Sequence, residues 1–136
     1  MFKHIMVPVD LHMPPAVVKA LDVAADFASS HGSRVTLVHV TDQQVKGAHT
    51  LGSSGEELAA LASKMAESSG ASVEALPIHS VDVGSEIDSI LTRTAKELQA
   101  DLIVIATHMP GILDYVFSSH ASHLVLHSEI SVFVVR

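Results

Sequence analysis

The chain has 136 residues, no cysteine and a formal net charge of −7. This length predicts a single domain over residues 1–136, and the absence of cysteine excludes a disulfide framework and thiol chemistry. The acidic balance argues against a nucleic acid or an anionic membrane surface as the main partner. No apolar run approaches the roughly 18 residues of a membrane span, and the N-terminal apolar stretch is too short for a signal peptide. We therefore expect a cytoplasmic protein.

The N-terminal part of the chain predicts a strand, a helix and a second strand. Residues 4–10 form a short apolar, β-branched run that ends in turn-like residues, which is typical of a buried strand. Pro14 and Pro15 suit the first turn of a helix, where a missing N–H costs little. Apolar residues then recur at helical spacing until Gly32, which is expected to end the helix. Residues 34–40 predict the second strand.

The middle of the chain predicts a loop, a helix and an edge strand. Residues 41–52 are polar and contain two glycines, which favours a loop. Ser53 or Ser54 is the expected N-cap of the helix that follows, since a glutamate lies three residues after each. Residues 72–80 alternate weakly and contain Pro77, which indicates a strand at the edge of a sheet.

The C-terminal part predicts two more helices and two more strands. Residues 85–100 form an amphipathic pattern of helical period. Residues 101–107 are the most apolar run, so this strand is expected in the centre of the sheet. A loop leads to a helix over about 117–127, and residues 131–136 predict a fifth strand.

This alternation predicts an α/β fold with a five-stranded parallel sheet and helices on both faces. With strands numbered in chain order, the spacing predicts the Rossmann-like order 3-2-1-4-5. The order reverses between the first and fourth strands, and ligands of such sheets bind at the carboxyl ends of the strands at that point. Residues 8–13 and 106–119 are therefore expected to face one crevice.

Four segments resemble the universal stress protein family, and together they span essentially the whole chain. They are "KHIMVPVD" at 3–10, "VTLVHV" at 35–40, "ELQADLIVIATH" at 97–108 and "VLHSEISVFVVR" at 125–136. The resemblance implies the same five-stranded fold, of the type found in adenine nucleotide alpha hydrolases. It also implies a homodimer, often formed by pairing of the last strands.

The last predicted strand agrees with such a dimer. Val132, Val134 and Val135 give it an apolar edge without a charge before Arg136, and unprotected apolar edges favour pairing. The alternative is an edge that a loop of the same chain covers.

The phosphate-binding motif of the family is degenerate in this sequence. ATP-binding members resemble Gly-x2-Gly-x9-Gly-[Ser/Thr] after the fourth strand, because glycines let backbone N–H groups approach phosphates. The corresponding positions hold Ala106, Met109 and Ser119, or Ser118 followed by Ser119 when aligned from the last strand. Met109 adds bulk, and Pro110 removes an N–H donor. We therefore expect ATP binding to be weak or lost, as in the branch of the family that does not bind ATP.

Other parts of the nucleotide site match the family. Asp10 corresponds to the residue that contacts the adenine or ribose side, Val40 to a backbone contact with adenine, and His108 to a position that often holds histidine or serine. The resemblance thus assigns to the site Pro8, Val9, Asp10, Val40, Ala106, His108, Met109, Ser118 and Ser119.

The ten histidines suggest two further kinds of site. His120, His123 and His127 share one helix face, but no carboxylate or thiol completes a metal set, and two turns separate the outer pair. We expect no metal there. His12 and His108 are expected beside Asp10 at the crevice mouth. A His–Asp pair can act as a general base, but no activated nucleophile accompanies it, and the interpretation we favour is that both histidines are partly exposed loop residues.

The remaining histidines have structural interpretations. His39 is expected to support packing at the end of its strand. Surface or strand-end positions are expected for His4, His31, His49 and His79.

Three functions remain open from the sequence. The first is a regulatory or stress-response binding module without catalysis, acting through an unknown protein partner, because nothing resembles an activated nucleophile. The second is a sensor that binds ATP, ADP or AMP in the crevice. The third is a small metal- or ligand-binding protein that uses the histidines.

Overall fold

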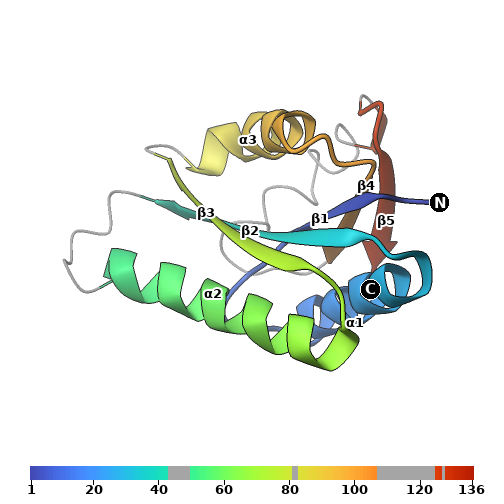
Figure 1. Cartoon of the computed structure of the whole chain (residues 1–136). Helices are drawn as coiled ribbons and strands as arrows, with labels where there is room; N and C mark the ends of the chain where they lie inside the picture. Colours follow the sequence, from blue (N-terminus) through green and yellow to red (C-terminus); the bar gives the residue numbers. More distant parts are fainter. Residues whose placement is uncertain (43–49, 81–82, 107–124, 127) are drawn as a thin grey trace.

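The computed structural model describes residues 1–42, 50–80, 83–106, 125–126 and 128–136, without the side chains of 42, 50–53 and 83–86. Strands and helices alternate along the chain, as the sequence predicts (Figure 1). The elements are β1 (His4–Pro8), α1 (Pro15–His31), β2 (Arg34–Asp42), α2 (Thr50–Ser69), β3 (Val73–Ser80), α3 (Val83–Glu97), β4 (Leu102–Ala106) and β5 (Ser131–Val135).

The five strands form one parallel sheet in the order β3-β2-β1-β4-β5. This is the predicted order, with the proline-containing β3 at one edge and the apolar β4 inside the sheet. Helices α1 and α2 cover one face and α3 lies on the other (Figure 1). Both faces of the inner strands are thereby removed from water, which explains why they are apolar throughout rather than alternating.

The hydrophobic core lies between the central strands and the helices. Every residue of β1 and β4 is buried. The buried face of α1 carries Val17, Ala20, Leu21, Ala24 and Ala28. Gly32 ends this helix in the left-handed conformation, with φ of 67°, and donates its N–H to Ala28 O. Glycine adopts this conformation without the steric cost of a Cβ atom, so the predicted end of α1 is confirmed.

Some predicted boundaries were wrong. Helix α2 begins at Thr50, so Ser53 and Ser54 lie within it and residues 50–52 are not part of a loop. A glycine costs about 1 kcal/mol in a helix relative to alanine. The buried face of α2 offsets this cost, because Leu58, Ala62 and Met65 pack into the core.

The other differences affect the ends of elements. Strand β1 ends at Pro8 rather than at residue 10, and a turn follows at residues 11–12. Helix α3 covers Val83–Glu97 rather than 85–100. Most of the helix predicted over 117–127 lies outside the described residues; residues 125 and 126 are helical. Within the described ranges, no helix is long and apolar enough to cross a membrane.

Candidate functional site

Strands β1 and β4 are the neighbours between which the strand order reverses. Pairing of β1 with β2 continues to Pro8, which lies opposite Val38. Pairing of β1 with β4 is confined to Ile5 and Met6, so it ends two residues before Pro8. The two strands therefore separate towards their carboxyl ends, as expected for the ligand crevice of an open parallel sheet.

The predicted valines of the site have buried side chains. Val9 and Val40 belong to the hydrophobic core. Val9 donates its N–H to Val38 O at 2.8 Å, and its carbonyl oxygen accepts a hydrogen bond from His39 Nδ1 at 2.8 Å. The side chains of Val9 and Val40 thus contribute to the core, and both backbone polar groups of Val9 have hydrogen-bond partners within the chain.

Asp10 begins a tight turn directly after β1. Met13 donates its N–H to the carbonyl oxygen of Asp10 at 3.0 Å, which closes the turn, and Met13 itself has a φ of 53°. The Asp10 carboxylate accepts the backbone N–H of His12 at 2.9 Å. Aspartate often stabilises turns through such a bond to the residue two positions on. The turn thus fixes the carboxylate at the carboxyl end of β1.

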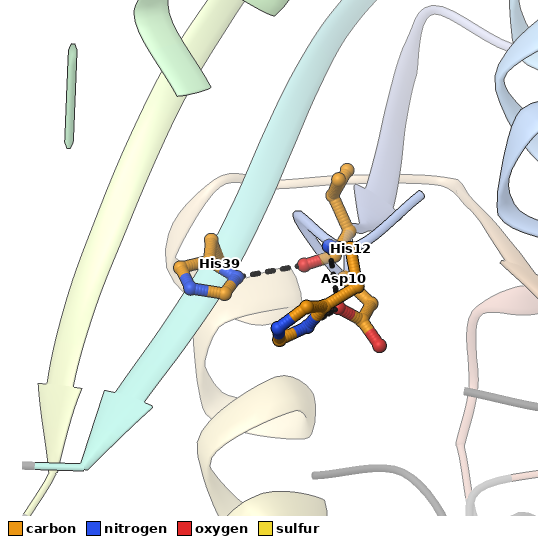
Figure 2. A network of polar contacts seen from close by, with 4 residues as sticks. Asp10, His12 and His39 are labelled. Atoms are coloured by element: carbon orange, nitrogen blue, oxygen red, sulfur yellow. Dashed lines mark hydrogen bonds and ion pairs between the residues drawn. The ribbon is translucent and has the colours of Figure 1, made fainter. Parts of the chain in front are cut away.

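The imidazole of His12 contacts the same carboxylate. His12 Nδ1 lies 2.9 Å from Asp10 Oδ1, and Figure 2 shows the ring folded back towards Asp10. The side chain of His12 is 92% exposed, whereas that of Asp10 is 10% exposed. Asp10 and His12 lie in the segment that follows β1, and His12 is exposed. Their role at a ligand site stays a prediction. His39, from β2, lies beside them and is buried, as expected (Figure 2).

The rest of the predicted site divides into two groups. Ala106 is fully buried at the end of β4, and Pro8 is buried at the end of β1. The positions outside the described residues are His108, Met109, Ser118, Ser119, His49, His120, His123 and His127. Across the part of the chain that the structure describes, no three histidine or acidic side chains are grouped so that they could hold a metal ion.

His4 lies at the amino end of β1, at the opposite end of this strand from Asp10. Its buried environment was not predicted from the sequence. It opens β1, as a strand-end residue, but it is not at the surface, because only 4% of it is exposed. Its Nδ1 lies 2.8 Å from Leu98 O, and its Nε2 lies 2.8 Å from Thr36 Oγ1. The sequence offered one indication of this burial: His4 is the first residue of an otherwise apolar run predicted to be a buried strand. By contrast, His31 and His79 are exposed, as expected.

Two ionisable groups at the amino ends of β1 and β4, His4 and Asp101, have shifted pKa values. Burial lowers the pKa of His4 below 6.5, although its hydrogen bond to Leu98 O acts in the opposite direction. Burial alone would raise the pKa of Asp101, but hydrogen bonds from the backbone N–H groups of Lys3 and His4 outweigh it and lower the pKa below 3.8. These groups stabilise the fold, and they lie away from the crevice.

Comparison with known families identifies the chain. The model of the universal stress protein family matches residues 1–136. The chain belongs to this family.

Solved structures of universal stress proteins share the fold. One from Archaeoglobus fulgidus is 22% identical, with a TM-score of 0.75 over 100% of this chain and 95% of that chain. Another from Archaeoglobus fulgidus, in complex with dAMP, is 23% identical, with a TM-score of 0.73 over 98% of each chain. A universal stress protein in complex with cAMP is 18% identical, with a TM-score of 0.68 over 99% of this chain and 97% of that chain. The five-stranded architecture is therefore that of the family.

Proposed function

We propose that this universal stress protein is a cytoplasmic, non-catalytic binding module in regulation or the stress response, acting through a protein partner, with ATP binding weak or lost. The observation that carries the proposal is the composition of the crevice. Asp10 and the backbone at Val9 and Val40 remain in place for the nucleoside end of a ligand. The glycine positions for the phosphates hold other residues.

Physical chemistry explains why these replacements weaken phosphate binding. A phosphate loop binds through several backbone N–H groups at close range, which requires residues without side chains. Methionine at 109 adds bulk, and proline at 110 has no N–H to donate. The chain's net charge of −7 further disfavours a polyanionic ligand.

Titration with ATP tests the proposal. We expect isothermal calorimetry on the wild-type protein to give a dissociation constant weaker than about 100 μM, equivalent to less than about 5.5 kcal/mol of binding free energy. A micromolar constant would contradict the proposal. The double variant Met109→Gly, Ser118→Gly is expected to bind ATP more tightly. If it does not, the missing glycines are not what limits affinity.

A second candidate is a sensor of ATP, ADP or AMP. Two observations favour it: the Asp10 carboxylate is held in the turn after β1 by the His12 N–H, and related structures contain dAMP and cAMP. A nucleoside monophosphate depends less on a phosphate loop than ATP does. Native mass spectrometry of the purified protein separates the two candidates, because a co-purified adenine nucleotide supports the sensor and a clean protein mass supports the non-nucleotide module.

We also propose a homodimer formed through β5. This strand lies at the edge of the sheet, and Phe133 and Val134 are 42% and 39% exposed. Edge strands with exposed apolar side chains favour pairing with another chain. The alternative, an edge covered by a loop of the same chain, remains open.

Light scattering after size exclusion tests the dimer. We expect the wild-type mass to be twice the 14.4 kDa of one chain. Val134→Lys should shift the protein to the monomer, because a lysine on an edge strand opposes pairing. The same change at Val73, on the opposite edge strand β3, is the matched control and should leave the dimer intact. A wild-type monomer, or a dimer unaffected by Val134→Lys, would contradict the proposal.

A further inference from the structure

The turn after β1 places two hydrogen-bond donors of one residue on one oxygen of Asp10. The backbone N–H of His12 and its Nδ1 both lie 2.9 Å from Asp10 Oδ1. Among the described residues, the side-chain contacts of this carboxylate all end on that oxygen. The imidazole therefore occupies one of the two oxygens that Asp10 offers at the crevice mouth (Figure 2).

The contact with the imidazole is easily displaced. The His12 side chain is 92% exposed, so almost no packing fixes the ring. A hydrogen bond from such an exposed ring contributes little net free energy, because water can replace it. By contrast, the bond from the His12 backbone N–H belongs to the turn and remains whatever side chain is present at this position.

A carboxylate with both oxygens available can accept two neighbouring hydroxyl groups of a sugar at once, one on each oxygen. Among the described residues, the imidazole and the His12 N–H contact Oδ1, and none contacts Oδ2. A ligand with a vicinal diol must displace the ring to place one hydroxyl on each oxygen. A ligand without either hydroxyl of the diol makes neither of these two bonds, so its affinity should not depend on the ring.

From this geometry, we propose that His12 is a specificity-determining residue: it competes with sugar hydroxyls for Asp10 Oδ1 and thereby disfavours ligands that carry a vicinal diol. The inference rests on the proposal that the crevice accepts the nucleoside part of a nucleotide. It acts at the nucleoside end and is independent of the missing glycines at the phosphate end.

The test compares two probes, adenosine and 2′,3′-dideoxyadenosine, neither of which carries phosphate. Their affinities for the wild-type protein and for His12→Ala are measured by chemical-shift titration. We expect His12→Ala to bind adenosine about two- to five-fold more tightly, the range set by the small net contribution of one hydrogen bond from an exposed side chain. Its affinity for the dideoxy probe should equal that of the wild type.

The matched control is His31→Ala, which removes another exposed imidazole, at the end of α1. It should leave both affinities unchanged, and thermal unfolding should show that both variants are folded. The proposal is overturned if His12→Ala binds adenosine no more tightly than the wild type, or shows no binding. It is also overturned if both probes gain equally, because the ring would then only block access. Each of these results leaves the calorimetric result with ATP unaffected, so the two proposals fail separately.

Discussion

Replacing His4 by alanine is expected to lower the free energy of unfolding by about 3–5 kcal/mol, the largest effect of any single change considered. The imidazole is 4% exposed and links β1 to Thr36 of β2 and to Leu98 after α3. Its removal leaves the buried Thr36 hydroxyl and the part-buried Leu98 carbonyl without this partner, which costs up to about 1–3 kcal/mol for each group. The vacated volume adds a cavity cost.

Urea denaturation followed by circular dichroism measures this loss. His31→Ala is the control, because that imidazole is exposed and, within the described residues, its contacts are with Phe27 of its own helix. It should change the free energy of unfolding by no more than about 0.5 kcal/mol. A loss below about 1 kcal/mol for His4→Ala would show that water or a rearrangement provides new hydrogen bonds to Leu98 O and Thr36 Oγ1.

His4 also makes stability depend on pH, with a definite sign. Its pKa in the folded protein lies below 6.5 because burial disfavours the charged ring. Above pH 6.5 the ring is neutral in both states, so its contribution is fully present. Below that pH the unfolded chain takes up the proton first, and stability falls until the lowered pKa of the folded state is passed. Arg34 lowers this pKa further, whereas Asp101 and Glu74 oppose the shift.

The measurement is the free energy of unfolding at several pH values between about 7.5 and 5. We expect the wild type to lose more stability over this range than His4→Ala, which has no titrating group at the position. If the free energy of unfolding of the two proteins falls equally over this pH range, the pH dependence does not arise from His4.

Replacing Asp101 by asparagine is expected to lower the free energy of unfolding by about 1.5–3 kcal/mol at neutral pH. The carboxylate accepts the backbone N–H of Lys3 at 2.9 and 3.1 Å and that of His4 at 2.9 Å. Asparagine offers one acceptor oxygen, and its amide group turns a donor towards these donors. The amino end of β1 would lose its charged anchor.

The pH dependence of this loss checks its cause. Because hydrogen bonds lower the pKa of Asp101 below 3.8, its contribution is present above that value and lost as the pH falls through the folded pKa. The difference between wild type and Asp101→Asn should therefore shrink in acid. Asp22→Asn, at an exposed position of α1, is the control and should change stability by no more than about 0.5 kcal/mol. A difference that persists in acid would point to packing instead of charge.

Most of the fold could be predicted from the sequence, because local patterns and topology agree. Alternating strand and helix patterns permit few arrangements once crossovers are right-handed. The end of α1 followed from Gly32. The start of α2 did not follow from the serine caps, because burial of one helix face outweighed the cost of glycines in its first turns.

The site could be predicted only in part. Their position after β1 and the predicted reversal of strand order favoured Asp10 and His12 as candidate site residues, and the structure places both in the turn after β1. That both donors of His12 fall on a single carboxylate oxygen depends on the turn geometry, which no residue pattern specifies. The burial of His4 was missed for a similar reason, since its partners Thr36 and Leu98 lie 32 and 94 residues away in sequence.

The anchors of the fold and the crevice occupy opposite ends of the strands. His4 and Asp101 tie the amino ends together, whereas Asp10 and His12 lie beyond the carboxyl end of β1. Changes in the residues that we propose to meet a ligand therefore leave the contacts of His4 and Asp101 at the amino ends of the strands in place.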